Sequence, residues 1–319
     1  MSKVSVIVPI YNVENYLRRN LESLRTQTYQ DIEVLMINDG STDNGQVIID
    51  EFEQKDSRFK GYLKENGGLS SARNYGLKLI ESEYVMFIDS DDFCEREMIE
   101  VCVQEMQINQ LDMFVFAYNQ YYVETSKKEK INLKIKEGVY SLEKDPSILA
   151  YTPNAAWNKM YRTALFKEYD IIYPEGYRHQ DLGTTAKLLY LSDKVGYSNQ
   201  ALYNYLIDRP NNITSKVDKK AYHIIDMVKE ILDFYQKNAV YKLYYDELNY
   251  LSEINLIQSL RKVVTNTNKE FVNQFIDDVF DMKKQYFNKK NRTYKIAFTS
   301  KDKIYLNRYL CKMYYLLKK

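Results

Sequence analysis

The stretch Tyr84-Val85-Met86-Phe87-Ile88-Asp89-Ser90-Asp91-Asp92 joins an apolar strand directly to three carboxylates. Carboxylates crowded at the end of a strand repel one another and resist the loss of water. A bound cation with oxygen ligands is the compensation that this pattern favours. The alternative is a helix cap, in which Asp91 or Asp92 precedes a helix that begins near Glu95.

Strands and helices alternate along the chain before these acids. Apolar runs predict strands over 4–10, 32–37, 59–63 and 84–88, and helical stripes predict helices over 16–24, 43–55 and 70–80. Such alternation predicts an α/β fold with a mostly parallel sheet flanked by helices, whose strands end at one rim. The segments 9–12, 39–43, 66–71 and 89–92 are therefore expected to meet in one crevice.

Four motifs stand at these strand ends. They are Pro9-Ile10-Tyr11-Asn12, Asp39-Gly40-Ser41-Thr42-Asp43, Asn66-Gly67-Gly68 with Ser71-Ala72-Arg73-Asn74-Tyr75-Gly76, and Asp89-Ser90-Asp91-Asp92. In order and spacing the chain resembles the family 2 glycosyltransferases of the GT-A fold, of the bacterial cell-surface polysaccharide type. The resemblance is close to about residue 92 and looser to about residue 215.

The resemblance implies a domain organisation. A GT-A-like domain would cover residues 1–215, with a nucleotide-sugar half to about residue 118 and an acceptor half over 119–215. A helical region would follow over 216–319, and its last part is basic.

Nucleotide contacts are also implied by the resemblance. Asp39 would accept a hydrogen bond from the uracil ring, and Pro9 and Tyr11 would pack on base and ribose. The full set implied for the nucleotide is Pro9, Tyr11, Asp39, Asn66, Gly67, Arg73, Asp89 and Ser90. From the residues alone, 39–43 is equally a turn that leads into a helix capped by Ser41, Thr42 or Asp43, and 66–68 is equally a flexible loop.

A metal ion follows from the same resemblance and from charge. Mn²⁺ or Mg²⁺ would neutralise the nucleoside diphosphate as it leaves. Asp91 would be the direct ligand, while Asp89 would orient the ribose or a metal-bound water. Asp92 receives no role.

The acceptor side and the general base are expected further along the chain. Trp157-Asn158-Lys159-Met160-Tyr161 and Pro174-Glu175-Gly176 resemble family motifs, and Asp181 aligns with the family's base. Gln180 stands where the family usually has Glu, so one charge beside the base is missing. Trp157, Lys159, Gln180, His179 and Arg209 are candidate contacts of the donor sugar or the acceptor. The alternatives are a helix cap for Asp181 and a solvated loop position for Arg209.

Composition excludes several protein classes. The 319 residues are 45% hydrophobic, enough for a large core, and no segment approaches the ~20 apolar residues of a spanning helix. Three scattered cysteines fit a reducing cytoplasm and no disulfide framework. The acidic body and the lack of a known motif disfavour nucleic-acid binding.

Charge is concentrated at the end of the chain. Residues 283–319 hold twelve Lys or Arg and one acid, a net +11, which leaves −10 for residues 1–282. Leu306, Tyr309, Leu310, Met313 and Leu317 share one helical face, and basic residues take the other. This tail is expected either to contact an anionic membrane surface, an anionic polymer acceptor or another subunit of a homo-oligomer, or to pack its apolar face on the helices of 218–264 and leave its basic face in solvent.

These patterns predict a metal-dependent, inverting glycosyltransferase. Its donor would be a UDP-sugar carrying a hexose or N-acetylhexosamine. Its acceptor would be a hydroxyl of a cell-surface glycan or lipid-linked precursor. Two alternatives remain open: a nucleotidyltransferase, although no glycine-rich loop follows the first strand, and a non-catalytic protein that binds sugar-nucleotide or polysaccharide.

Overall fold

The computed structural model describes residues 3–207, 219–266, 268–287, 293–294, 304–305 and 307–317. By its internal contacts the chain divides into two units. The first holds residues 1–176 and 184–210, and the second holds residues 177–183 and 211–319. The boundary expected at residue 215 lies outside the described residues, and the short segment 177–183 groups with the helical unit.

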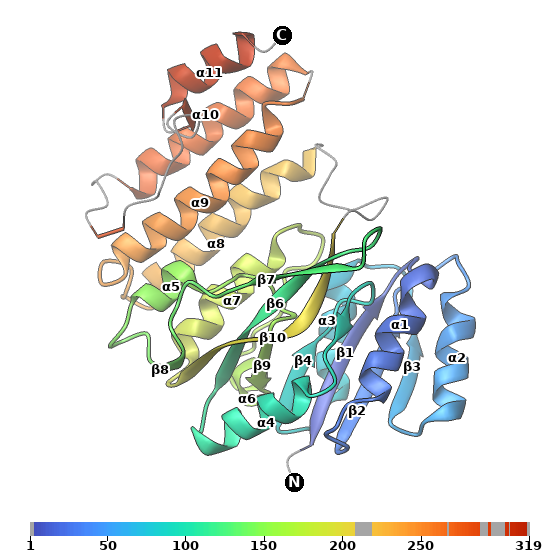
Figure 1. Cartoon of the computed structure of the whole chain (residues 1–319). Helices are drawn as coiled ribbons and strands as arrows, with labels where there is room; N and C mark the ends of the chain where they lie inside the picture. The colour runs from blue at the N-terminus through green and yellow to red at the C-terminus, as the bar shows by residue number, and fades with distance from the viewer. Residues whose placement is uncertain are drawn as a thin grey trace. The chain divides into compact units, whose positions relative to one another are not determined.

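The first unit is built on one sheet (Figure 1). Its strands in chain order are β1 (Val4–Ile10), β2 (Ile32–Asn38), β3 (Phe59–Leu63), β4 (Tyr84–Phe87), β5 (Phe93–Cys94), β6 (Met113–Tyr122), β7 (Lys127–Ile131), β8 (Gly138–Tyr140), β9 (Lys159–Arg162) and β10 (Val195–Ile207). Neighbours follow the order β3-β2-β1-β4-β9-β6-β10-β5, with β7 beside β6 and β8 beside β10. The sheet is parallel from β3 to β4 and mixed beyond, where β9 runs antiparallel between β4 and β6. The predicted α/β fold is confirmed.

Helices connect these strands. They are α1 (Glu14–Arg25), α2 (Gly45–Lys55), α3 (Leu69–Leu79), α4 (Met98–Ile108), α5 (Ser147–Tyr151), α6 (Ala164–Lys167) and α7 (Gln180–Leu191). After Asp92 the chain forms β5, and α4 begins only at Met98, with Glu97 in the cap position. The interpretation of Asp91 or Asp92 as a helix cap is therefore wrong.

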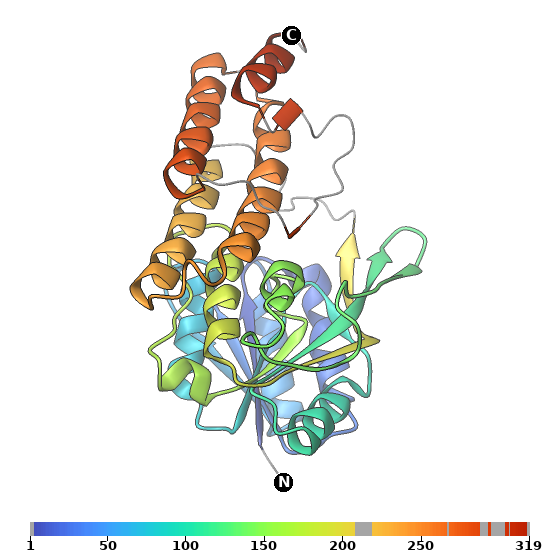
Figure 2. The same cartoon turned by 90° about the vertical axis from the view of Figure 1, so that its left-hand side faces the viewer.

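The two faces of the sheet carry different helices. Alternate residues of a strand point to opposite faces. Val4, Val6 and Val8 belong to a buried cluster that also contains apolar residues of α1, α2 and α4. Ile7 points to the other face, which α3 covers (Figures 1 and 2). The sheet is thus enclosed on both sides, and its carboxyl edge remains for function.

An aromatic cluster supports the α3 face. The ring of Phe87 lies 6.0, 5.6 and 5.1 Å, between centroids, from Tyr161, Phe166 and Tyr173. The guanidinium of Arg73 lies 5.1 Å from the centre of the Tyr173 ring. A charged group is therefore held against an apolar surface next to the end of β4.

The three cysteines, Cys94, Cys102 and Cys311, are free and buried. Burial raises the pKa of each thiol, that of Cys311 to about 12. All three are therefore protonated at neutral pH.

The second unit is helical. Its elements are η2 (Lys219–Tyr222), α8 (His223–Lys237), α9 (Tyr245–Val263), α10 (Lys269–Tyr286) and α11 (Arg308–Leu317). α8 contacts α9, and α10 contacts α8, α9 and α11. Within the described part of the chain, no helix combines the length and the apolar character that crossing a bilayer requires.

The orientation of α11 corrects one expectation. Arg308 and Lys312 pair with Asp277 of α10, and Arg308 also pairs with Asp281. Tyr309, Leu310 and Met313 are exposed instead. The expectation that the apolar face packs and the basic face is solvated is wrong for these residues, because two acids of α10 attract the basic side. Leu306 and the side chain of Leu317 lie outside the described structure.

The contact of α3 with the sheet gives a stability prediction. A Cβ on Gly76 would lie 2.7 Å from Cγ2 of Ile7. We expect Gly76→Ala to lower the free energy of unfolding by about 1–3 kcal/mol, because the added methyl overpacks this contact. Ile7→Ala removes the opposing atoms, so the double variant should lose less stability than the sum of the single variants. Urea unfolding of the three variants measures this coupling, and strictly additive losses would contradict the close approach.

Candidate active site

The carboxyl ends of β1, β2 and β4 share one edge of the sheet, because these neighbouring strands are parallel. Two side chains tie the segments after β1 and β2 together. The side-chain oxygen of Asn12 accepts the N–H of Thr42 at 2.8 Å, and the carboxylate of Asp43 accepts the N–H of Glu14 at 2.9 Å. Tyr11 directly precedes Asn12 and is 48% exposed. Its ring is thus available at a sheet edge whose backbone is fixed.

Asp39 is buried directly after β2 and surrounded by donors. Its carboxylate accepts the N–H groups of Gly67 at 3.0 Å and Gly68 at 2.7 Å, and the ammonium of Lys64 lies 2.5 Å away. The side-chain amide of Asn66 donates to the backbone oxygen of Asp39 at 2.8 Å. Gly68 has φ +86°, which glycine adopts without strain. The loop 64–68 therefore wraps around this carboxylate and fixes its direction.

Asp89 is compensated by a buried arginine. The guanidinium of Arg73 is fully buried and lies 2.8 Å from the carboxylate of Asp89, which is partly exposed. Arg73, which belongs to α3, thus contacts Asp89 from the face of the sheet that α3 covers.

Asp92 is turned into the protein. Its carboxylate accepts the hydroxyl of Tyr203 and the N–H of Leu206, each at 2.8 Å. Burial, and the nearby Asp91 and Asp89, raise the pKa of Asp92 well above its usual value. Asp89 and Asp92 therefore point to different partners, and each carboxylate has a partner within the protein.

Tyr203 connects the far end of the sheet to this turn. Its hydroxyl donates to Asp92 and accepts the N–H of Asp89 at 3.3 Å. Its ring stacks on Trp157 at 4.6 Å between centroids and 10° between planes, and Tyr205 stacks on the same tryptophan. Trp157 is 8% exposed, so in this arrangement it forms the wall that holds Tyr203.

Lys159 is a buried residue that organises a loop. Its ammonium donates to the carbonyls of Pro153 and Ala155 at 2.7 and 2.5 Å and to the side chain of Asn158 at 2.8 Å. Three acceptors match the three N–H groups of an ammonium. The side chain of Lys159 thus points into the loop that carries Trp157.

Asp91 is the main candidate ligand for a metal ion. It lies in the turn between β4 and β5 and is 7% exposed. Among the described residues no group of three or more His, Cys, Asp or Glu forms a complete site. Asp91 and Asp89 offer only carboxylate oxygens, and Mg²⁺ typically uses one or two such groups together with substrate phosphates and water. The residues fit an ion that is completed by a diphosphate.

The candidate base lies in the second unit. Asp181 is the second residue of α7 and Gln180 the first, so Asp181 does not occupy the cap position that was its alternative. His179, with φ +62°, precedes them. Burial first, and then Lys262 and Arg178, lower the pKa of His179 to about 4, so its ring is neutral at neutral pH. Arg209 lies outside the described residues.

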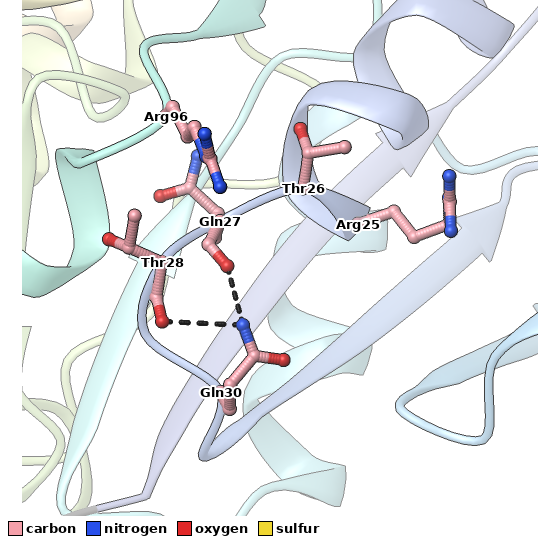
Figure 3. Close-up of a pocket in the computed structure, with 6 residues that line it drawn as sticks. All are labelled: Arg25, Thr26, Gln27, Thr28, Gln30 and Arg96. Atoms are coloured by element: carbon pink, nitrogen blue, oxygen red, sulfur yellow. Dashed lines mark hydrogen bonds between the residues drawn. The ribbon is translucent and has the colours of Figure 1, made fainter.

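One depression lies at the opposite edge of the sheet. It is lined by the last residue of α1, by residues of the α1–β2 connection and by one arginine before α4 (Figure 3): Arg25, Thr26, Gln27, Thr28, Gln30 and Arg96. The amide of Gln30 donates to the carbonyls of Gln27 and Thr28. It is remote from the carboxyl ends of the strands, and it holds none of the acids discussed above.

Residues 5–170 match the model of the family described as "Glycosyl transferase family 2", and this span is about half of the chain. This chain belongs to glycosyl transferase family 2. The resemblance drawn from the four motifs is confirmed.

Curated glycosyltransferases are similar to this chain over different shares of their own length. Glycosyltransferase GlyA of Streptococcus pneumoniae is 36% identical over 244 residues, which are 72% of this chain and 34% of GlyA. The chain thus spans about a third of the length of that relative. Glycosyltransferase GlyG of the same organism is 32% identical, over 63% of this chain and 70% of GlyG.

Solved structures share the GT-A fold of this family 2 chain. TarS 1–349 of S. aureus in complex with UDP-GlcNAc has a TM-score of 0.60 at 21% identity. The match covers 93% of this chain and 95% of the TarS chain. The mannosyltransferase PcManGT of Pyrobaculum calidifontis, in complex with GDP-Man and Mn²⁺, has a TM-score of 0.53 at 13% identity. The match covers 99% of this chain and 87% of the PcManGT chain.

Three residues contact the acids of this site in a way that the sequence did not predict. Lys64 precedes the glycines without any local signal, and Tyr203 reaches the acids from 114 residues away. Asn20 is different, because its side-chain amide donates to the backbone oxygens of Asp89 and Asp92 from the buried stripe of α1. A polar residue inside an apolar stripe was a signal that could have found it.

The bridging hydroxyl gives a second prediction. We expect Tyr203→Phe to lower the free energy of unfolding by about 1–3 kcal/mol, because the carboxylate of Asp92 and the N–H of Asp89 both lose a buried partner. Tyr118→Phe is the matched control, since Tyr118 packs edge-on against the same tryptophan. Urea unfolding compares the two, and equal effects would argue against the bridge.

Proposed function

We propose that this chain transfers a sugar from a UDP-sugar to an acceptor hydroxyl, with inversion at the anomeric carbon and with Mn²⁺ or Mg²⁺ as cofactor. The observation that carries the proposal is that Asp39 and the turn 89–92 lie at the same edge of the sheet. The carboxylate of Asp39 accepts two backbone N–H groups there and pairs with the ammonium of Lys64. In a family 2 chain, this edge combines a carboxylate suited to a nucleobase with acids suited to a metal-bound diphosphate. The UDP-GlcNAc held by TarS, which shares the fold, supports the choice of donor.

The surroundings of Asp39 suit uracil. The edge of this base presents one N–H between two carbonyl oxygens. Asp39, whose direction the N–H groups of Gly67 and Gly68 fix, supplies an acceptor for the N–H, and the ammonium of Lys64 supplies a donor beside it. Tyr11 and Pro9 are assigned to packing on base and ribose, and Asn66 and Ser90 to contacts along the nucleotide.

The turn after β4 suits the diphosphate. Asp91, with Asp89 beside it, would hold the cation, which when bound neutralises charge on the departing nucleoside diphosphate. Arg73 positions Asp89 through their ion pair and so acts on the nucleotide indirectly.

Transfer needs a base for the acceptor. The acceptor oxygen forms a bond to the anomeric carbon while the bond from that carbon to the phosphate oxygen breaks and its electron pair leaves with the nucleoside diphosphate. The proton of the acceptor passes to Asp181, a contribution of about 10²–10⁴-fold in rate. Gln180 leaves Asp181 without the neighbouring carboxylate usual in the family, and His179 is neutral beside it.

The acceptor is assigned by class. We place the enzyme in the cytoplasm, acting on a cell-surface glycan or its lipid-linked precursor, with Trp157 and Arg209 as the remaining candidates for sugar contacts. Lys159, the other candidate, is buried and its ammonium is taken up by three acceptors of the protein. A nucleotidyltransferase is disfavoured because β1 leads through Tyr11 and Asn12 directly into α1, without a glycine-rich phosphate loop. A non-catalytic binding protein is the second candidate, which turnover distinguishes.

The metal assignment gives a third prediction. We expect UDP to bind more tightly with Mn²⁺ or Mg²⁺ than with a chelator, and Asp91→Ala to abolish this difference while the protein remains folded. Titration calorimetry measures it. Glu97→Ala, which removes an exposed acid further along the same connection, is the control that should keep the metal effect. UDP affinity independent of metal in the unaltered chain would refute the assignment.

The base assignment gives a fourth prediction. We expect Asp181→Asn to reduce sugar transfer by about 10²-fold or more and to leave UDP affinity almost unchanged, because the amide cannot accept the proton of the acceptor. Gln180→Ala tests the neighbour separately. Near-normal turnover of Asp181→Asn would exclude Asp181 as the base. Absence of turnover in the unaltered chain with a panel of UDP-sugars and acceptors would favour the binding protein.

A further inference from the structure

The candidate base stands where an irregular stretch of chain becomes a helix. Among the described residues, no helix or strand lies between the end of α6 at Lys167 and the start of α7 at Gln180. Asp181 is half-buried in the first turn of α7, and the positive φ of His179, +62°, turns the chain into that helix. The first turn of a helix is where the helix frays. The direction of the Asp181 carboxylate therefore depends on what holds the residues before it.

The earlier part of this stretch is held by Asn74 of α3. The side-chain oxygen of Asn74 accepts the N–H of Tyr173 at 2.8 Å. Its amide donates to the carbonyl of Tyr173 at 2.8 Å and to the carboxylate of Glu175 at 3.1 Å. Gly176 follows with φ +81°, and a Cβ built on it meets no described atom within 4 Å. This anchor ends before residues 177–179, which need another.

His223, the first residue of α8, supplies that second anchor. Its Nδ1 accepts the backbone N–H of Arg178 at 2.9 Å. The centre of its ring lies 4.9 Å from the centre of the Tyr177 ring, with 56° between the planes. Residues 177–183 group with the helical unit by their internal contacts. Polar and ring contacts to one side chain thus hold the segment that leads into the base.

Magnitudes separate a positioning role from a purely structural one. A hydrogen bond of this kind contributes about 1 kcal/mol to the free energy of unfolding. A displacement of about 1 Å at a catalytic group can cost about 10²-fold in rate. Because Arg178 is three residues before Asp181, release of its N–H changes the path of the chain into α7 while most of the fold is retained.

We propose that His223 is a positioning residue for Asp181, which acts through the backbone of residues 178–181 and takes no proton itself. The proposal rests on the assignment of Asp181 as the base in the proposed function. It goes beyond that function because it gives a residue of the helical unit a part in sugar transfer.

Two substitutions of His223 separate its acceptor atom from its ring. His223→Phe keeps a ring against Tyr177 and removes the acceptor, whereas His223→Asn loses the ring and keeps an acceptor oxygen on Cγ. We expect His223→Phe to lower kcat for transfer about tenfold to 10²-fold and to leave UDP affinity unchanged, and His223→Asn to restore most of the rate. Asp226→Ala, which removes an exposed acid from the first turn of α8, is the control that should transfer normally.

A double variant shows whether His223 acts through the base. In the Asp181→Asn background, His223→Phe should reduce transfer little further, because no base is left to position. An independent structural loss would multiply the two effects. Hydrogen exchange of the unaltered chain is a second measurement that needs no variant, since the amide of Arg178 should be protected.

The outcomes distinguish this inference from the proposed function. Absence of transfer by the unaltered chain, or normal transfer by Asp181→Asn, would refute the function and the role of His223 together. Slow transfer by Asp181→Asn beside normal transfer by His223→Phe would overturn the positioning role alone. The same holds for a loss of UDP affinity in His223→Phe, for effects that multiply in the double variant, and for rapid exchange of the Arg178 amide in the unaltered chain.

Discussion

The hydroxyl of Tyr203 is the contact on which the acidic turn after β4 depends. It accepts the N–H of Asp89 and donates to the carboxylate of Asp92, and thereby joins the end of β10 to the turn after β4. Burial raises the pKa of Tyr203 well above its usual value, so the hydroxyl remains a donor at neutral pH. The amide of Asn20 holds the same turn through two backbone oxygens. On the opposite face, Arg73 holds the carboxylate of Asp89. The turn is thus anchored from both faces, which fixes the direction in which each acid points.

The order of the fold was predictable from local patterns. Strands β1 to β4 begin and end within one residue of the apolar runs that predicted them, and α2 and α3 within two residues of theirs. These elements follow from periodicity and from short turns, both of which the sequence displays directly. The antiparallel insertion of β9 between β4 and β6 was not predictable in this way, because it depends on pairing between strands that are far apart in the chain.

The sequence predicted which residues belong to the candidate site but not the directions in which their side chains point. The motifs identified Asp39 and the acids at 89–92, because their residue types and spacing resemble a family. The divergence of those acids was not visible, since Tyr203, Leu206 and Arg73 reach them from distant segments. The same limit applied to α11, where Asp277 and Asp281 of another helix decided which face is turned inward. Tertiary partners, rather than the amphipathic pattern itself, selected the buried side.

The buried thiols have a practical consequence for experiments on this chain. Because burial keeps Cys94, Cys102 and Cys311 protonated and covered, none of them presents a thiolate to a maleimide or a spin-label reagent under native conditions. A single cysteine introduced at an exposed position would therefore be the reactive one, without prior removal of the native thiols. Fluorescence or electron paramagnetic resonance can then follow Tyr11 at the sheet edge and Met313 on α11 one at a time, in an otherwise unaltered protein.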